Sequence, residues 1–386
     1  MSFTSRRDFL KNAAIGSAAA GTGLSASVLF SEPSGFNRIR YRDLGSTGCK
    51  VSEMGFGVLH TQDTALIHGA IDSGINYFDT AHGYQNGACE TTLGKVMKTR
   101  RKEIFLTTKI SGAPEKMREE IDISLKRLQT DCVDMLLVHG PGSREQILNN
   151  DTMQVMDDAR SQGKTRFIGF STHNQVVGLD AAIESNFWQS VSLPYNYFSP
   201  PEVIDAIKRT RKNGIAIIAM KALITVERPR KPFPDIRTDK NGSTTNQQAL
   251  LRWVLNDPNV DTVIPGIGSF EHLADDVAVM GTKLTMNDRQ IIRRYTANAK
   301  QHYCQGIAGC TGCREMCPYG VEVHDLNRCI NYAYGYGSID LARYNYYNLP
   351  RSSRIEKCDN CETCVVKCVN GLDTNATVHR ARTLFA

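Results

Sequence analysis

The stretch Gly74-Ile75-Asn76-Tyr77-Phe78-Asp79-Thr80-Ala81-His82-Gly83-Tyr84 decides the fold. Its apolar run from Ile75 to Phe78 predicts a short buried strand that begins after a turn at Gly74. Asp79 then lies at the carboxyl end of the strand, and Tyr84 lies on the loop beyond it. Polar groups in this position are typical of parallel barrels, which hold their chemistry at the carboxyl ends of their strands.

Two further apolar runs end in polar residues in the same way. Residues 103–108 predict a strand that stops at Lys109, and residues 132–138 predict one that stops at His139. Lysine and histidine are unusual choices for packing at the end of an apolar strand. We therefore expect Asp79, Tyr84, Lys109 and His139 to meet at one end of the fold.

These four residue types suit proton transfer to or from an oxygen atom. The tyrosine phenol has a reference pKa of about 10. A nearby Lys109 ammonium would lower that pKa, and an Asp79 carboxylate would keep the lysine charged and oriented. His139 would donate a hydrogen bond to a substrate oxygen that gains negative charge. The alternative is a structural ion pair between Asp79 and Lys109 beside an ordinary loop tyrosine.

The four residues resemble the catalytic tetrad of the aldo-keto reductases. Further stretches resemble signatures of that family in the same order, namely Arg42-Asp43-Leu44-Gly45-Ser46-Thr47-Gly48, Val51-Ser52, residues 163–171 and Ile264-Pro265-Gly266. The resemblance covers roughly residues 38 to 300. It implies an oxidoreductase that interconverts a carbonyl and an alcohol by hydride transfer with a nicotinamide, with Tyr84 as general acid or base.

The alternation of elements also predicts a (β/α)₈ TIM barrel, of the usual length of about 250 residues. We expect a hairpin over residues 38–52 and amphipathic helices over residues 115–129, 201–213 and 244–256. The expected strands lie near Met54, Ile75, Ile104, Val133, Phe167, Val191, Ile215 and Val263. A doubly wound open sheet is disfavoured, because residues 55–60 lack the full glycine fingerprint of a dinucleotide fold. Residues 226–245 predict a long loop on the rim of the barrel.

The resemblance also implies a set of nicotinamide-binding residues, although several differ from the usual family residues. Thr172 replaces an asparagine, Ser192 a glutamine, and Met220 an aromatic residue, while Lys221 is placed to reach a phosphate. NADP is the expected cofactor, and NAD is the alternative. The expected cofactor-binding residues are Gly57, Val58, Asp79, Ser171, Ser192, Met220, Lys221, Gly268, Ser269 and Asp276.

Residues 301–386 contain nine of the twelve cysteines and predict a small ferredoxin-like iron-sulfur domain. Cys358, Cys361, Cys364 and Cys368 have the spacing of a [4Fe-4S] motif. The preceding run is a variant of that motif, and in two-cluster ferredoxins the last cysteine of each run ligates the other cluster. We therefore expect one cluster on Cys317, Cys358, Cys361 and Cys364, and a second on Cys304, Cys310, Cys313 and Cys368. A three-iron second cluster or none remains an alternative, as do zinc and disulfides.

Six tyrosines lie between the cysteine runs, and we expect them to pack this domain against the barrel rather than to line a path for substrate. They are Tyr332, Tyr334, Tyr336, Tyr344, Tyr346 and Tyr347. Three histidines lie near the predicted mouth of the barrel, where solvated loop positions are the commoner outcome. They are His60, His82 and His173.

Residues 1–30 resemble a twin-arginine export signal. Arg6 and Arg7 precede a weakly apolar run that is rich in alanine, glycine and serine. We therefore expect a folded protein exported to the periplasm by the twin-arginine machinery. A retained membrane anchor is the alternative, but the polar residues of the run suit a membrane span poorly.

The composition fits globular units of this kind, because 41% of the residues are hydrophobic and 22% are charged. The formal net charge of +6 is modest and scattered, so nucleic-acid binding is not indicated. We expect three parts, at residues 1–30, 38–300 and 301–386, and a small carbonyl or alcohol substrate. The alternative function is an electron-transfer or binding protein in which the barrel is a scaffold and the clusters serve a redox partner.

Overall fold

A computed structural model of the chain describes residues 39–59, 61–223, 244–299, 304, 313, 316–334, 339–360, 363–369 and 371–385. The expected export signal, nearly all of the expected rim loop, His60, Cys310 and Cys361 lie outside the described residues.

Eight parallel strands form one sheet in the order β10-β9-β8-β7-β6-β5-β4-β3. They are β3 (Phe56–Gly57), β4 (Tyr77–Asp79), β5 (Phe105–Ile110), β6 (Val133–His139), β7 (Thr165–Ser171), β8 (Ser190–Pro194), β9 (Ala216–Met220) and β10 (Thr262–Ile264). Two isolated parallel bridges, Met54 to Val263 and Gly57 to Gly266, bring the ends of the sheet together. The predicted (β/α)₈ barrel is confirmed, and every predicted strand is present.

Helices cover the outside of the barrel, so the strands are buried on both faces and read as nearly continuous apolar runs. The covering helices are α2 (Thr64–Asp72), α3 (Ala88–Arg100), α4 (Pro114–Leu128), α5 (Arg144–Ile147), α6 (Asn150–Ser161), α7 (Gln175–Ser185), α8 (Pro201–Lys212), α9 (Asn246–Leu255), α10 (Phe270–Val277) and α11 (Met286–Ala299). The predicted helices at 115–129, 201–213 and 244–256 correspond to α4, α8 and α9.

A hairpin of β1 (Tyr41–Asp43) and β2 (Lys50–Ser52) closes the amino-terminal end of the barrel. The buried Asp261 carboxylate holds it there, since it accepts hydrogen bonds from Gly45 N and Ile217 N, both at 3.0 Å, and pairs with Arg211 at 2.7 Å. Gly45 has φ +53°, and a Cβ there would lie 2.6 Å from the Gly214 carbonyl oxygen. Only glycine fits this close approach of two backbones.

The described residues after 300 form a second, helical unit with its own apolar core. It contains α12 (Val323–Tyr334), α13 (Ile339–Tyr347), the 3₁₀ segment η4 (Ile355–Asn360) and α14 (Thr374–Phe385). In this core the ring of Tyr346 stacks on Phe385 with centroids 4.3 Å apart. We call the described residues from 316 to 385 the C-terminal unit. The predicted ferredoxin-like iron-sulfur domain stays a prediction.

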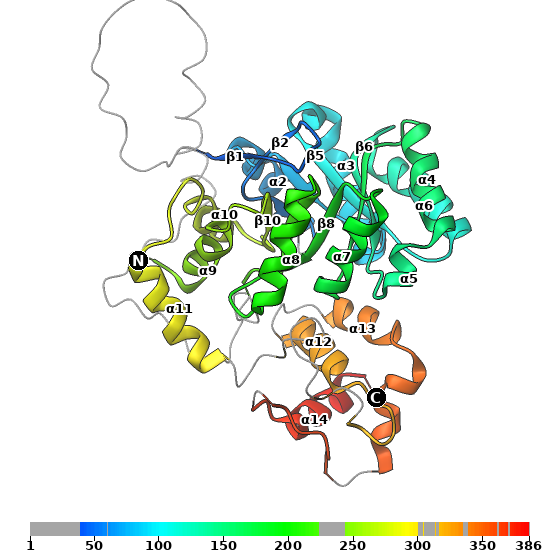
Figure 1. Cartoon of the computed structure of the whole chain (residues 1–386), viewed down its shortest axis with the longest axis vertical. Helices are drawn as coiled ribbons and strands as arrows, with labels where there is room; N and C mark the ends of the chain where they lie inside the picture. The colour runs from blue at the N-terminus through cyan, green and yellow to red at the C-terminus, as the bar shows by residue number, and fades with distance from the viewer. Residues whose placement is uncertain are drawn as a thin grey trace, which may run out of the picture.

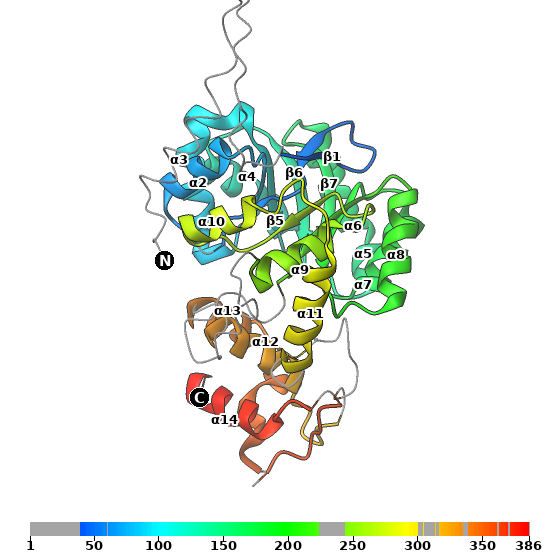
Figure 2. The same cartoon turned by 90° about the vertical axis from the view of Figure 1, so that its left-hand side faces the viewer.

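The C-terminal unit lies at the end of the barrel opposite the β1–β2 hairpin (Figures 1 and 2). The hairpin covers the floor, so the unit faces the carboxyl ends of the strands, where the predicted catalytic residues lie. None of the helices in the described ranges is both long and apolar enough to span a bilayer.

Candidate active site

Asp79 and Lys109 form a buried ion pair at the carboxyl ends of neighbouring strands. Asp79 ends β4, and Lys109 lies one residue before the end of β5. The Lys109 ammonium contacts Asp79 Oδ1 and donates a second hydrogen bond to the Thr80 carbonyl oxygen at 2.8 Å. The two side chains are 2% and 3% exposed, so this charge pair is almost fully removed from water.

Tyr84 is held above this pair by the backbone of the loop after β4. His82 N donates to the Lys109 carbonyl oxygen at 2.9 Å, which ties the loop to β5, and Tyr84 N donates to the Ala81 carbonyl oxygen at 3.1 Å. Lys109 Nζ lies 5.1 Å from the centre of the Tyr84 ring. The His139 ring, from the end of β6, meets the same ring edge-on with centroids 5.7 Å apart. The structure thus brings the four predicted residues together.

A buried polar network supports the Tyr84 loop from behind, and sequence reasoning missed it. The Arg127 guanidinium donates to the His82 carbonyl oxygen at 3.1 Å and pairs with Glu90 at 3.3 Å. Glu90 is fully buried and accepts a hydrogen bond from Thr108 Oγ1 at 2.7 Å, one residue before Lys109. His82, expected to be a solvated loop residue, is half-buried, and its Nδ1 lies 3.1 Å from Ser124 Oγ.

The protonation states of the pair follow from competing effects. Desolvation acts to lower the pKa of Lys109, but the Asp79 carboxylate and Tyr84 outweigh it and raise the pKa. Desolvation raises the pKa of Asp79 against the opposing effect of Lys109. Both carboxyl and amine thus show raised pKa values, and we assign the shared proton to Lys109, because its Nζ donates to two oxygens at once.

Burial also decides the net pKa shift of Tyr84. Desolvation raises the pKa of Tyr84 more than the Lys109 ammonium lowers it, so the net shift is upward. As predicted, the Lys109 charge acts to lower the pKa of Tyr84. Burial raises the pKa of Tyr84 by more than the Lys109 charge lowers it.

His139 is neutral at physiological pH. Desolvation of its enclosed side, followed by the positive charges of Lys109 and Lys221, lowers the pKa of the ring. His139 is the exposed last residue of β6. A neutral imidazole still has one N–H with which to donate to a substrate oxygen.

Three neighbouring strands provide a polar wall beside this group. Strand register places His139 beside Ser171 and Ser171 beside Ser192. Ser192 Oγ is buried and, among the described residues, has no hydrogen-bond partner. A buried hydroxyl of this kind fits a ligand amide, which offers both a donor and an acceptor. Met220 ends β9 next to Pro194 of β8, so it borders the same wall.

The expected adenosine-side residues lie at the ends of β3 and β10. Gly57 approaches the Pro265 carbonyl oxygen, to which a Cβ would be 3.1 Å away, and Val58 is fully buried. Ser269 is the N-cap of α10 and accepts a hydrogen bond from His272 N at 3.2 Å, while Asp276 is fully buried on that helix. Gly268 N lies 3.4 Å from His272 Nδ1. Their assignment to a cofactor stays a prediction.

Comparisons with known proteins address the family. Residues 56–226 match the model of the aldo/keto reductase family. This part of the chain is therefore similar to the aldo/keto reductases. It is 26% identical over 289 residues to L-galactose dehydrogenase of Arabidopsis thaliana, a match that covers 63% of this chain and 88% of that protein. It is 26% identical over 268 residues to methylglyoxal reductase DkgB of Salmonella typhimurium, covering 67% and 98% respectively.

A solved aldo-keto reductase from Klebsiella pneumoniae, in complex with NADPH, shares the fold. It superposes with a TM-score of 0.57 at 24% identity, covering 67% of this chain and 95% of that one. The likeness supports the barrel fold.

The predicted cluster ligands lie around a cavity of about 460 Å³ in the C-terminal unit. Its wall includes Cys317, Cys358 and Cys364, which are three of the four residues expected to hold one cluster, and the fourth, Cys361, is outside the described residues. Cys368, expected to serve the other cluster, is not in that wall. Within the described ranges, no group of three or more histidine, cysteine or acidic side chains is close enough to hold a metal ion.

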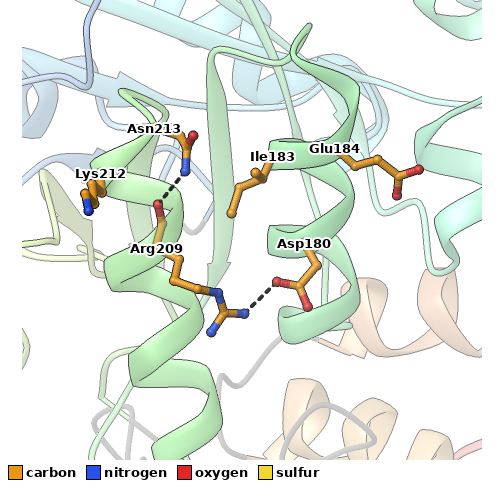
Figure 3. A pocket seen from close by; sticks show the side chains of 6 residues that line it. All are labelled: Asp180, Ile183, Glu184, Arg209, Lys212 and Asn213. Carbon is orange, nitrogen blue, oxygen red and sulfur yellow. Dashed lines mark hydrogen bonds and ion pairs between the residues drawn. The ribbon is translucent and has the colours of Figure 1, made fainter.

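A second hollow, of about 350 Å³, lies on the outer surface between α7 and α8 (Figure 3). Three of its charged groups already pair with protein atoms: Arg209 contacts Asp180 at 2.7 Å, and Glu184 pairs with Arg144. We assign no ligand to this hollow.

The ion pair yields a prediction about stability. Lys109→Met leaves the Asp79 carboxylate buried without its counter-charge, so we expect the free energy of unfolding to fall by about 3–5 kcal/mol in denaturant titrations. The double variant Lys109→Met/Asp79→Asn removes both charges and is expected to regain part of that loss.

The exposed pair Lys50–Asp43, at 2.7 Å, provides the control. The same two replacements there are expected to cost less than about 1 kcal/mol. Full carbonyl turnover by the Lys109→Met/Asp79→Asn variant would contradict a catalytic role and support a purely structural ion pair.

Proposed function

We propose that this protein is a nicotinamide-dependent oxidoreductase that interconverts a small carbonyl compound and the corresponding alcohol. The observation that carries the proposal is the convergence of Asp79, Lys109, Tyr84 and His139 at the carboxyl end of an aldo/keto reductase barrel. Relatives with related activities by name, a methylglyoxal reductase and an L-galactose dehydrogenase, support it.

In the reducing direction, Tyr84 is the proton donor. Its raised pKa keeps the phenol protonated at neutral pH, so the acid is ready when substrate arrives. As the proton leaves, negative charge appears on the phenolate, and the Lys109 ammonium 5.1 Å from the ring centre stabilises it. The neutral His139 donates a hydrogen bond to the same substrate oxygen and fixes its position. In oxidation the steps reverse, and the phenolate of Tyr84 accepts the proton.

A bound nicotinamide would supply or accept the hydride at the substrate carbon. Ser171 and Ser192 fit its carboxamide, because they lie side by side at the strand ends and Ser192 Oγ lacks a described partner. We propose NADP rather than NAD, since the K. pneumoniae neighbour is a complex with NADPH.

We further propose that the C-terminal unit holds iron-sulfur clusters. The cavity bounded by Cys317, Cys358 and Cys364 supports this, since the same residues were expected from spacing alone. The cavity also favours a second candidate function, in which the clusters pass electrons to a redox partner and the barrel is a scaffold.

Export is the last part of the proposal. Arg6 and Arg7 precede a weakly apolar run, and twin-arginine substrates cross the membrane folded with their cofactors in place. An enzyme that loads clusters before export needs such a route. We propose that the twin-arginine machinery is a partner and that the enzyme works in the periplasm.

The catalytic assignment predicts the behaviour of Tyr84→Phe. Loss of the proton donor is expected to lower kcat for carbonyl reduction by about 10² to 10⁴. Cofactor affinity, measured by fluorescence titration with NADPH, is expected to stay within about twofold, because the ring is retained. Phe198→Leu, which alters an aromatic of the loop after β8, is the control. Near wild-type turnover by Tyr84→Phe would exclude the assignment.

The cluster assignment predicts iron content. After anaerobic reconstitution, Cys364→Ser is expected to lower iron from about eight to about four atoms per chain, as one of two [4Fe-4S] centres is lost. Cys132→Ser, which changes a thiol on the barrel, is expected to keep the wild-type content. Equal iron in both variants, or zinc in place of iron, would reject the assignment.

The export assignment predicts the location of a leader variant. With both Arg6 and Arg7 changed to lysine, the receptor-read signal is lost, and the protein is expected to remain in the cytoplasmic fraction. Cell fractionation with an activity assay and an immunoblot measures this. Periplasmic recovery equal to that of the wild type would disprove twin-arginine export.

A further inference from the structure

The C-terminal unit contacts the mouth of the barrel at two places. On one side, Lys221 Nζ at the end of β9 donates to the Tyr332 hydroxyl of α12 at 3.3 Å and lies 5.5 Å from the centre of its ring. On the other side, a Cβ at Gly83, next to Tyr84, would lie 2.9 Å from the Tyr344 hydroxyl of α13. Two helices of the unit therefore border the catalytic group.

The contact at Lys221 is built with some backbone strain. Lys221 has φ +55°, a left-handed conformation that costs an ordinary side chain about 1 kcal/mol or more. The Asn196 side chain donates to the Lys221 carbonyl oxygen at 3.1 Å and stabilises this conformation. Strain of this kind is more often found where a side chain must be aimed at a functional site.

A second cation lies on the same face of α12. Arg328 precedes Tyr332 by four residues, so the two side chains are neighbours on the helix. Its Nη2 pairs with Asp325 at 3.1 Å, but its Nε is buried and has no hydrogen-bond partner among the described residues. A buried guanidinium N–H without an acceptor is costly, so this N–H is suited to donate to a ligand.

Carboxylates lie beside Arg328. Asp325 pairs with it at 3.1 Å, and Glu322 lies 3.2 Å from the neighbouring His324. No carboxylate in the described part of the chain forms an ion pair with Lys221, whereas Lys109 is neutralised by Asp79. The effect of the Lys221 charge appears at His173. The charge of Lys221, then burial, then Arg328 and His139 lower the pKa of that ring well below its ordinary value.

We propose that Lys221, Arg328 and the Tyr332 hydroxyl form an anion-binding subsite that holds a carboxylate group of the substrate. The substrates are then carbonyl compounds or alcohols that also carry an acidic group. This inference rests on the proposed function and narrows its substrate class.

A carboxylate, with its two oxygens, fits these donors better than a monatomic anion does. The planar Arg328 fork offers its free Nε–H together with an Nη–H, which is the arrangement that carboxylates accept in pairs. The subsite is assembled from both units of the chain, because Lys221 belongs to the barrel and Arg328 to α12. Phosphate of the cofactor is the rival anion, and the experiment below separates the two.

The test compares two aldehydes with the same reacting carbonyl, 4-carboxybenzaldehyde and the neutral 4-formylbenzamide, on the full-length protein with NADPH. Arg328→Gln is expected to raise KM for the carboxylate aldehyde about 10-fold, the effect of one lost charged hydrogen bond. KM for the amide, kcat for both aldehydes and the Kd for NADPH are expected to stay within about twofold. Arg343→Gln, on the exposed surface of α13, is the matched control and is expected to change nothing.

Each other result overturns the inference. An equal rise in KM for both aldehydes indicates a general disturbance of the mouth. A rise in the Kd for NADPH assigns the cations to the cofactor. Unchanged KM for 4-carboxybenzaldehyde removes Arg328 from the site.

A binding measurement separates this inference from the proposed function. Calorimetric titration of the wild-type protein with benzoate, and of Arg328→Gln under the same conditions, needs no turnover. About 10-fold weaker binding in the variant supports the subsite even if neither aldehyde is reduced. Absence of any turnover of 4-formylbenzamide refutes the proposed activity. Equal benzoate binding by both proteins refutes the subsite alone.

Discussion

The buried ion pair between Lys109 and Asp79 is the interaction on which the catalytic end of the barrel depends. Taking two charges out of water is expensive, and the mutual attraction offsets that cost only when the geometry is exact and other polar atoms are satisfied. The barrel supplies the geometry, since β4 and β5 are paired in fixed register and the Thr80 carbonyl oxygen accepts the second Lys109 hydrogen bond. The second Asp79 oxygen, Oδ2, is buried and has no hydrogen-bond partner among the described residues. The Lys109 carbonyl oxygen in turn holds His82 N, so one residue fixes both the charge beneath Tyr84 and the loop that carries it.

The position of Tyr84 is a balance between burial and charge. Burial alone would make the phenolate inaccessible at any useful pH, and an exposed phenol would sit at its reference pKa of about 10. In the protein without ligand, burial prevails and the tyrosine is a neutral acid. Lys109 stabilises Tyr84 when the proton leaves, because its positive charge then faces a phenolate instead of a neutral hydroxyl. A group with this arrangement serves as an acid in one direction and as a base in the other.

The pattern of short apolar runs ended by polar residues was enough to predict the barrel and the meeting of Asp79, Lys109 and His139 at one end of it. Each strand is a short apolar run, and Asp79, Lys109 and His139 stand out because polar residues end such runs without a packing reason. What the sequence did not reveal depends on contacts between distant residues. Tyr332 was expected only to pack, yet its hydroxyl contacts Lys221, which lies 111 positions earlier in the chain. Arg127, which pairs with Glu90, supports the Tyr84 loop by donating to the His82 carbonyl oxygen. The net pKa shift of Tyr84 was also missed, since the sign of a charge effect is visible in a sequence whereas the extent of burial is not.

Helix α12 links the two halves of the molecule physically. Its first residue, Val323, lines the cavity that contains Cys317, Cys358 and Cys364, and its later residues Arg328 and Tyr332 face the mouth of the barrel. The contact of Thr377 in α14 with Asn327, at 2.8 Å, fixes the helix between these two places. A rigid helix cannot shift at one end and stay in place at the other. Helix α12 therefore borders both the cysteine cavity and, through Tyr332 and Lys221, the end of the barrel at which Asp79, Lys109, Tyr84 and His139 meet.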